Sequence, residues 1–348
     1  MLNKQVFGWD IGGAHVKLAV LDNSGNILAV RQYACPLWKG IGYLQEVLDR
    51  VKHEFGSHSL RHCLTMTGEL ADCFADREEG VLTIVSTMQS GFSGQSLLIF
   101  AGRLGFVPAD QLVAAHIMHI ASANWVASAV WAAKYHAHGL FVDIGSTTCD
   151  ILLLENQQLN ALGYSDYDRL VSGELLYTGI IRSAVPSIAQ RAVFRGREMG
   201  LMAEFFATMA DVYRLTGDLQ ESHDQAETAD GAEKTRFASA RRLSRLTGYE
   251  FAEADWEIWL AFAQHLKHQQ KQLIWQACLQ QLQRCAHPKP NCLIGAGVGR
   301  FLLVELAQEH GWTYLDFKDS FPPVADGAGM DAGDCAPAVA VAYLALDL

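Results

Sequence analysis

The chain has 348 residues, of which 50% are hydrophobic and 19% are charged, and its formal net charge is -11 at pH 7. This composition is typical of a folded globular protein, and the length allows two domains. The acidic balance argues against a nucleic-acid partner, because affinity for a phosphate backbone comes mainly from clustered Lys and Arg.

The cysteine spacing, the N-terminal sequence and the length of the uncharged runs argue against further classes of protein. Eight cysteines stand at irregular spacings without a CxxC pair, which argues against a disulfide framework and a zinc site. The N-terminus shows no basic-then-apolar signal pattern, and no uncharged run is long enough for a membrane span. We therefore expect a cytoplasmic protein without a membrane partner; a homo-oligomer is compatible with the sequence. The basic stretch "SARRLSRL" around Arg242 is interpreted as a solvated helix face.

The first hundred residues alternate between short apolar strands and turns. The segments "QVFGWDI", "VKLAVLD" and "ILAVRQYA" are joined by Gly- and Asn-containing turns, which predicts an antiparallel meander of strands. A helix is expected around residues 43–55 and a strand near "HCLTMTGE". The pattern then predicts a strand at "GVLTIV", residues 80–85, and an amphipathic helix from Gly94 onward.

An Ala-rich segment, residues 121–136, predicts a buried helix. Directly after it the meander pattern restarts with "GLFVDIGS", "TCDILLLE" and "LNALGYS". This restart indicates an internal duplication whose period is far longer than the roughly 20 to 50 residues of a solenoid repeat. Residues 199–285 are mostly helical by pattern, but the polar stretch 216–235 predicts an exposed or weakly ordered loop. A strand "PNCLIGAGVG", a helix "RFLLVELAQEHG", a strand "WTYLDF" and a small-residue helix "DCAPAVAVAYLAL" follow.

Both meanders contain an Asp at the end of a strand and a Gly turn directly after it. Such turns present backbone N–H groups that can cradle phosphate oxygens, and the adjacent carboxylate can hold Mg²⁺. Asp10 and Asp143 are therefore candidate metal ligands. The candidate phosphate- or nucleotide-binding residues are Asp10, Gly12, Gly13 and Lys17 in the first copy, and Gly145, Ser146, Thr147 and Thr148 in the second.

A third Gly-rich element, "LIGAGVGRFLL", places Gly295, Gly297 and Gly299 between a strand and a helix. These glycines allow a nucleotide to approach the backbone closely. The element is not the dinucleotide fingerprint, because Arg300 stands where GxGxxG requires glycine. The alternative is a plain strand-to-helix turn.

Several polar residues have both a functional and a structural interpretation. Glu69 either orients substrate or helps Thr67 to cap the following helix, and Asn124 on the Ala-rich helix is a candidate substrate contact. Asp150 either serves the site or faces solvent on the second hairpin. The segment after the second meander supplies candidates that either border a cleft or form structural ion pairs, namely Arg169, Glu174 and Arg182.

The order of Asp-Gly hairpin, Ala-rich helix, second hairpin, Gly-rich turn and small-residue helix resembles the actin, Hsp70 and sugar-kinase superfamily. That resemblance implies a duplicated, ribonuclease H-like α/β fold with an interlobe cleft, lobe I being 1–135 plus 335–348 and lobe II 136–334. Within it the chain resembles the hydantoinase/oxoprolinase group, and more narrowly the proteins of tetrahydromethanopterin-linked C1 transfer, whose archaeal members are methanofuran-biosynthesis synthases. The narrower resemblance rests on "GWDIGGAHVKLA", "MTGELADCF", "SANWVASA", "FVDIGSTTCDI", "RLVSGELLYTG" and "LMAEFFATMADVYRLTG".

The resemblance implies a Mg²⁺-dependent transferase. It would join an aminomethylfuran diphosphate to the phenol of a tyramine- or tyrosine-type acceptor, form an ether and release pyrophosphate. Lys17 and Mg²⁺ near Asp10 and Asp143 would neutralise the leaving diphosphate. The candidate bases for the phenolic proton are Asp143, Asp150 and Glu174.

Two alternatives keep the fold and change the function. One is an ATP-using small-molecule kinase or an ATP-dependent amidohydrolase of the hydantoinase/oxoprolinase kind. The other is a nucleotide-binding regulatory protein without catalysis. The first hairpin has no Ser or Thr at positions 13–15, which argues against strong ATPase activity more than against diphosphate binding.

Overall fold

The computed structural model describes residues 5–56, 60–285, 290–326, 329–346 and 348. Its internal contacts divide the chain into two compact units. Unit 1 comprises Met1–Phe141, Leu152–Ser172 and Leu315–Leu348, and unit 2 comprises Val142–Ile151 and Gly173–Tyr314. The division expected from the sequence, 1–135 plus 335–348 against 136–334, stays a prediction.

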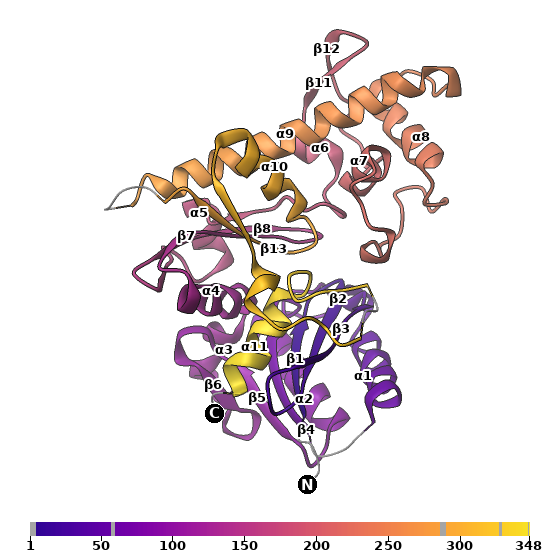
Figure 1. Ribbon diagram of the computed structural model, residues 1–348. Helices are drawn as coiled ribbons and strands as arrows, with labels where there is room; N and C mark the ends of the chain where they lie inside the picture. Colours follow the sequence, from indigo (N-terminus) through magenta and orange to yellow (C-terminus); the bar gives the residue numbers. More distant parts are fainter. Residues whose placement is uncertain (1–4, 57–59, 286–289, 327–328, 347) are drawn as a thin grey trace. The chain divides into compact units, whose positions relative to one another are not determined.

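A six-stranded sheet forms the centre of unit 1, in the order β3-β2-β1-β4-β5-β6 (Figure 1). The first three strands form the expected antiparallel meander, and β1 pairs in parallel with β4. The strands are β1 (Gln5–Ile11), β2 (His15–Leu21), β3 (Ile27–Ala34), β4 (Leu60–Met66), β5 (Ser96–Phe100) and β6 (Phe106–Pro108).

Alternation along β1 separates the two faces of this sheet. Phe7, Trp9 and Ile11 are fully buried in a core that α1 and α2 also line. On the opposite face a Cβ at Gly8 would lie 2.1 Å from the carbonyl oxygen of Ala338, so glycine allows α11 to lie directly against β1. The helices of unit 1 are α1 (Gly42–Phe55), α2 (Arg77–Gly91), α3 (Ala114–Ile120), α4 (Asn124–Tyr135), α5 (Asp166–Ser172) and α11 (Ala336–Leu346).

Two expectations for unit 1 are wrong. Residues 80–85 belong to α2 and not to a strand, because Asp76 caps the helix by accepting from the N–H of Glu79 at 2.9 Å. The buried residues Val81, Ile84 and Val85 then recur at helical spacing. The segment after Gly94 is the strand β5, which pairs in parallel with β4, and not an amphipathic helix.

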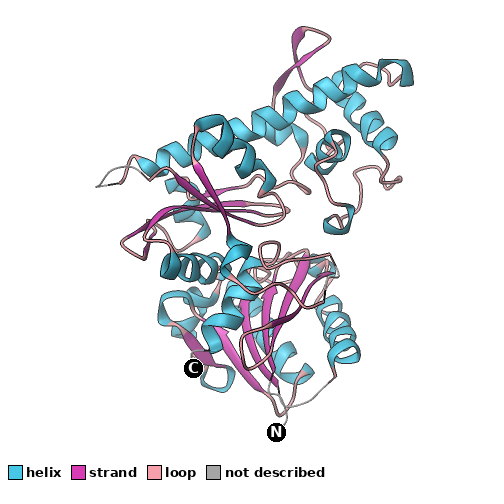
Figure 2. Ribbon diagram, in the orientation of Figure 1, coloured by secondary structure: helices cyan, strands magenta, loops and turns pink. Residues whose placement is uncertain are grey.

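The second sheet has the order β10-β8-β7-β13-β14, and β9 pairs with β8. Figure 2 shows its strands in magenta. The order β8-β7-β13 repeats the order β2-β1-β4 of the first sheet, which confirms the duplicated, ribonuclease H-like α/β fold of the actin-like ATPases. The strands are β7 (His138–Ile144), β8 (Cys149–Glu155), β9 (Gln158–Asn160), β10 (Leu175–Leu176), β13 (Cys292–Ala296) and β14 (Thr313–Asp316).

Unit 2 is completed by helices and by a two-stranded hairpin that the sequence did not predict. The hairpin consists of β11 (Arg191–Phe194) and β12 (Arg197–Gly200) and lies against the long helix α9 (Figure 1). The helices are α6 (Val185–Ile188), α7 (Met209–Thr216), α8 (Arg236–Thr247), α9 (Trp256–Leu282) and α10 (Phe301–His310).

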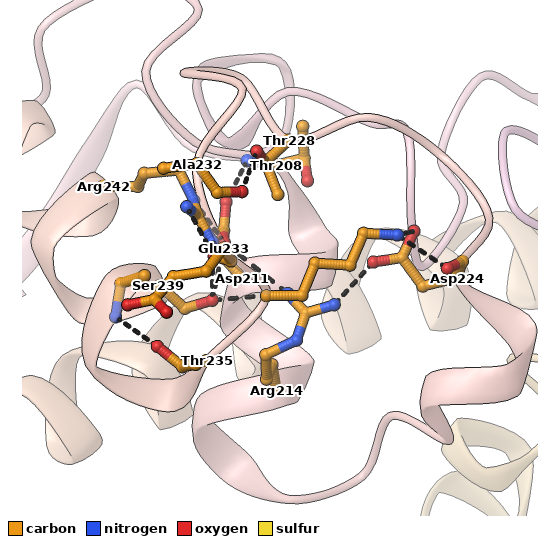
Figure 3. Close-up of polar contacts among 12 residues, drawn as sticks. Thr208, Asp211, Arg214, Asp224, Thr228, Ala232, Glu233, Thr235, Ser239 and Arg242 are labelled. Carbon is orange, nitrogen blue, oxygen red and sulfur yellow. Dashed lines mark hydrogen bonds and ion pairs between the residues drawn. The ribbon is translucent and has the colours of Figure 1, made fainter.

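The polar stretch 216–235 is tied to the helices by two buried arginines (Figure 3). Arg214 of α7 lies 2.5 Å from Asp224, and Arg242 of α8 lies 3.0 Å from Asp230 and 2.8 Å from Asp211. Arg242 is 2% exposed, so the prediction of a solvated face is wrong at this position. The sequence pattern could not reveal it, because the partner Asp211 lies on another helix.

Two expectations from the sequence concern the cysteines and the apolar helices. None of the eight cysteines takes part in a disulfide. Among the residues that the structure describes, no helix combines the length and the apolar character needed to cross a bilayer.

Candidate functional site: two Asp-Gly turns and a buried carboxyl

The first Asp-Gly turn connects β1 and β2 in unit 1. The N–H of Gly12 donates to the carbonyl of His15 at 2.9 Å and closes the turn. Lys17 is the direct cross-strand neighbour of Asp10, which is only 4% exposed. A Cβ at Gly13 would meet no atom within 4 Å, so the turn is open on that side. The structure thus brings the first set of candidate residues together.

The second turn has the same hydrogen bond. The N–H of Gly145 donates to the carbonyl of Thr148 at 2.9 Å, and Asp143 again stands two residues before the glycine. The hydroxyls of Ser146 and Thr147 lie 3.4 Å apart. By this equivalence Asp150 occupies the position that Lys17 occupies in the first copy, so the duplicated positions carry opposite charges.

The backbone that follows β10 packs against the second turn and donates hydrogen bonds to it. The N–H groups of Ile181 and Arg182 both donate to the carbonyl of Ser146, the latter at 2.8 Å. A Cβ at Gly179 would lie 2.3 Å from Ser146 and Thr147 backbone atoms, so only glycine fits there. Gln270 of α9 donates to the carbonyl of Gly179 at 3.0 Å. Neither Gly179 nor Gln270 was anticipated, because no short motif contains them.

The Gly-rich turn lies against the same element of unit 2. Gly297 has φ +80°, and a Cβ there would lie 2.3 Å from Oδ1 of Asp143. The N–H of Gly299 donates to the carbonyl of Ile144 at 2.8 Å. The Gly-rich turn therefore packs its backbone on the Asp143 carboxylate. Gly295, by contrast, lies against the ring of Tyr314.

The loop after β4 packs on the first turn. The N–H groups of Thr67 and Gly68 both donate to the carbonyl of Ile11 at 2.9 Å. A Cβ at Gly68 would lie 3.1 Å from the carbonyl of Gly12. The next residue, Glu69, has 0% exposure. Because Asp76 caps α2, the capping interpretation of Thr67 and Glu69 is wrong.

A chain of polar contacts begins at Glu69. The hydroxyl oxygen of Ser122 lies 2.8 Å from Oε1 of Glu69 and 3.0 Å from Oδ2 of Asp166. Arg77 forms an ion pair with the same oxygen of Asp166 at 3.0 Å. Burial raises the pKa of the Glu69 carboxyl, and the Ser122 hydrogen bond opposes that shift only in part. Sequence reasoning missed Ser122 and Asp166, since neither stands in an Asp-Gly turn.

The remaining candidates lie in varied surroundings. The amide of Asn124 donates to Oδ1 of Asp10 at 3.3 Å, which brings Asn124 to the first turn. Arg169 is 2% exposed, and its guanidinium lies 4.0 Å from the centre of the Trp125 ring. Glu174 is fully buried and lies 3.2 Å from Arg284. Arg182 reaches the second turn through its backbone, and its side chain is exposed.

Comparison with known proteins places the chain in a family. The family model described as Hydantoinase/oxoprolinase matches residues 61–334. The chain belongs to the hydantoinase/oxoprolinase family. A protein of Methanocaldococcus jannaschii, named (4-{4-[2-(gamma-L-glutamylamino)ethyl]phenoxymethyl}furan-2-yl)methanamine synthase, is 29% identical over 242 residues, which cover 69% of this chain and 71% of the relative. This confirms the resemblance to methanofuran-biosynthesis synthases that the sequence motifs indicated.

Two further similarities concern a second relative and a solved structure. A protein of the same name from Methanococcus vannielii is 28% identical over 107 residues, which cover 31% of this chain and 48% of that protein. Both relatives are thus named as synthases. The nucleotide-free structure of acetone carboxylase matches 88% of this chain and 67% of its own, with a TM-score of 0.54 and 10% identity. That likeness shows the fold alone.

Proposed function

We propose that this chain is a transferase that condenses an aminomethylfuran diphosphate with the phenol of a tyramine- or tyrosine-type acceptor. The reaction releases pyrophosphate and serves the synthesis of a methanofuran-type C1 carrier. One observation carries the proposal: the similarity, over 69% of the chain, to a synthase named for a furan methanamine that carries a phenoxymethyl group. That name describes a furan and a phenol joined through one ether carbon.

The turns suit a diphosphate leaving group. The bond between the furylmethyl carbon and the diphosphate oxygen breaks, and its electron pair leaves with pyrophosphate. The phenolic oxygen then forms the new bond to that carbon. Backbone N–H groups of the Gly turns, together with the ammonium of Lys17, offset the charge that develops on the leaving diphosphate.

Magnesium fits the donors that the two turns offer. Carboxylate oxygens are the protein ligands that Mg²⁺ prefers, usually one or two of them with substrate phosphates completing the shell. Asp10 and Asp143 are buried carboxylates beside the turns, with exposures of 4% and 7%. No group of three or more His, Cys, Asp or Glu side chains suited to a metal occurs among the described residues. Asp10 in the first turn and Asp143 in the second are the candidate ligands, and an ion held at either turn would supply positive charge to the diphosphate oxygens.

Family membership favours one second candidate. The hydantoinase/oxoprolinase match over residues 61–334 is compatible with an ATP-dependent amidohydrolase or a small-molecule kinase on the same fold. This candidate differs from the synthase in its phosphate donor: it releases orthophosphate or transfers a phosphoryl group from ATP, and it forms no ether.

The test is a parallel assay of the purified chain with Mg²⁺. One reaction contains an aminomethylfuran diphosphate and a phenolic acceptor, and the other contains ATP and the same acceptor. We expect pyrophosphate only in the first, with a loss of about 100-fold in Asp143→Asn and none in the exposed control Asp110→Asn. Orthophosphate from ATP without ether would contradict the synthase and support the second candidate.

A further inference from the structure

Three polar side chains from distant segments meet inside unit 1. Ser122 stands between two carboxyl groups, 2.8 Å from Oε1 of Glu69 and 3.0 Å from Oδ2 of Asp166. Ser122 has φ +50°, a left-handed backbone conformation that costs a non-glycine residue free energy and is often retained at functional sites. The three residues thus form a short, continuous chain of hydrogen-bonding groups.

The protonation state of the Glu69–Ser122–Asp166 series follows from the single hydrogen of the Ser122 hydroxyl. A serine hydroxyl has one hydrogen and cannot donate to two ionised carboxylates at once. One carboxyl group must therefore carry a proton. Asp166 has Arg77 at 3.0 Å, whereas Glu69 is fully buried, and burial raises the pKa of its carboxyl above the ordinary value. Glu69 is accordingly the protonated member, donating to Ser122, which donates to Asp166.

The second carboxyl oxygen of Glu69, Oε2, is the buried end of the Glu69–Ser122–Asp166 series. Oε2 is buried and has no hydrogen-bond partner among the described residues, which is costly for a polar atom unless a ligand completes it. The neighbouring Gly68 packs on Gly12 of the first turn. Asn124, two residues after Ser122, donates to Asp10. Both ends of the Glu69–Ser122 contact are thus anchored to the first turn.

The other end of the chain is open to water. The side chain of Asp166 is 27% exposed and that of Arg77 is 23% exposed. A proton that reaches Asp166 can therefore leave to solvent. The structure places a buried acid at one end and a solvated, ion-paired carboxylate at the other, with a single hydroxyl between them.

We propose that Glu69, Ser122 and Asp166 form a proton relay that removes the phenolic proton of the acceptor. This inference rests on the proposed function. The phenolic proton bonds to Oε2 of Glu69 while the proton on Oε1 moves to Ser122 and the proton of Ser122 moves to Asp166. Asp166 then releases it to water. The phenolic oxygen bonds to the furylmethyl carbon, pyrophosphate leaves with the electron pair of the broken bond, and Glu69 and Ser122 end with one proton each.

The first experiment varies the ionisation of the acceptor. Ser122→Gly removes the hydroxyl and suits a positive φ, and Glu69→Gln keeps the side-chain shape. With an ordinary phenol we expect kcat to fall by about 100-fold in each variant. With a ring-fluorinated acceptor that is already ionised at the assay pH, both variants should come within about threefold of the wild type, because no proton remains to be removed. Ser128→Ala, which removes a buried hydroxyl that lies on α4, is the control and should change neither rate.

Equal losses with both acceptors would overturn the relay, since they would indicate a structural role. An infrared difference measurement separates this outcome from failure of the proposed function. The free protein should show the C=O band of a protonated, buried carboxyl, which Glu69→Gln removes and Ser122→Gly shifts. Absence of that band in the wild type at neutral pH would overturn the relay whatever the enzyme makes. A wild type that shows the band but forms no ether with either acceptor would refute the proposed function and this use of the relay.

Discussion

Lys17 faces Asp10 directly across the β1–β2 hairpin. The two side chains lie on the same face of the sheet, so a cation and a carboxylate stand together beside the open side of a turn whose N–H groups suit phosphate oxygens. The equivalent position of the second hairpin carries Asp150. The duplication has therefore kept the turn and changed the charge that accompanies it, which predicts different roles for the two copies.

The first prediction concerns that cation. Lys17→Met keeps the aliphatic stem and removes the charge, so the diphosphate loses an interaction that strengthens as the leaving group develops charge. We expect kcat/KM for the furan diphosphate to fall by about 100-fold, measured by pyrophosphate release. Lys52→Met, which removes a surface ion pair with Asp49 and a cation–π contact with Phe92, should leave kcat/KM unchanged. An unaltered kcat/KM in Lys17→Met would show that the ammonium does not contact the diphosphate.

The second prediction concerns the contact of Gly297 with Asp143. Gly297→Ala adds a methyl group where Asp143 Oδ1 lies 2.3 Å away and keeps a φ of +80°, so we expect a loss of about 3 kcal/mol in the free energy of unfolding. Gly311→Ala at φ +67° meets no atom within 4 Å and should lose only about 1 kcal/mol. Denaturant titration of both variants measures the difference. Equal losses would mean that the Asp143 contact is not tight.

The third prediction concerns the buried arginine of α8. Arg242→Met leaves Asp211 buried without the partner at 2.8 Å, and removing one member of a buried pair costs about 3–5 kcal/mol. Because Arg242 also forms an ion pair with Asp230, the segment 216–235 should be cleaved faster in limited proteolysis. Arg241→Met, on the exposed side of the same helix, is the matched control. Identical cleavage in both variants would show that Arg242 does not hold the segment.

The fourth prediction concerns the stability of unit 1 at low pH. His62 accepts a hydrogen bond from the indole N–H of Trp9 at 3.0 Å, and burial lowers the pKa of His62 from 6.5 to about 4. In the unfolded chain His62 is protonated below about pH 6.5, whereas in the folded chain it stays neutral down to about pH 4. The free energy of unfolding therefore decreases as the pH falls from 6.5 toward 4. The loss should reach about 3 kcal/mol.

Denaturant titrations at several pH values between 4 and 7 measure this loss. His62→Gln retains an acceptor for Trp9 but does not titrate, so its stability should change less over that range. The same pH dependence in wild type and variant would assign the effect to other groups.

The strands and helices whose hydrophobic pattern repeats within one segment could be predicted from the sequence. The alternation in β1, β2 and β7 and the Ala-rich pattern of α4 depend on local periodicity, and the structure has these elements where they were expected. A strand was predicted at residues 80–85 because "GVLTIV" is apolar and rich in β-branched residues. The helix that forms there depends on the cap at Asp76 and on the packing of Val81 and Val85. Tertiary packing overrode local propensity.

The candidate site could be predicted only in part, because some of its residues stand in short motifs and others meet only in the folded structure. The Asp-Gly turns are short motifs, so Asp10, Asp143 and their glycines were visible in the sequence. The Glu69–Ser122–Asp166 chain joins residues separated by 53 and 44 positions, and a single sequence carries no signal for such a meeting. Arg242 was misjudged likewise, because its burial depends on Asp211, 31 residues away.

The most direct measurement of the central claim is the stoichiometry of the reaction in the absence of ATP. The full chain is incubated with Mg²⁺, an aminomethylfuran diphosphate and a phenolic acceptor, and pyrophosphate and ether are quantified in the same sample. The proposed function predicts equal amounts of both, with neither formed when the acceptor is omitted. Pyrophosphate without an equal amount of ether, or no ether at all, would contradict it.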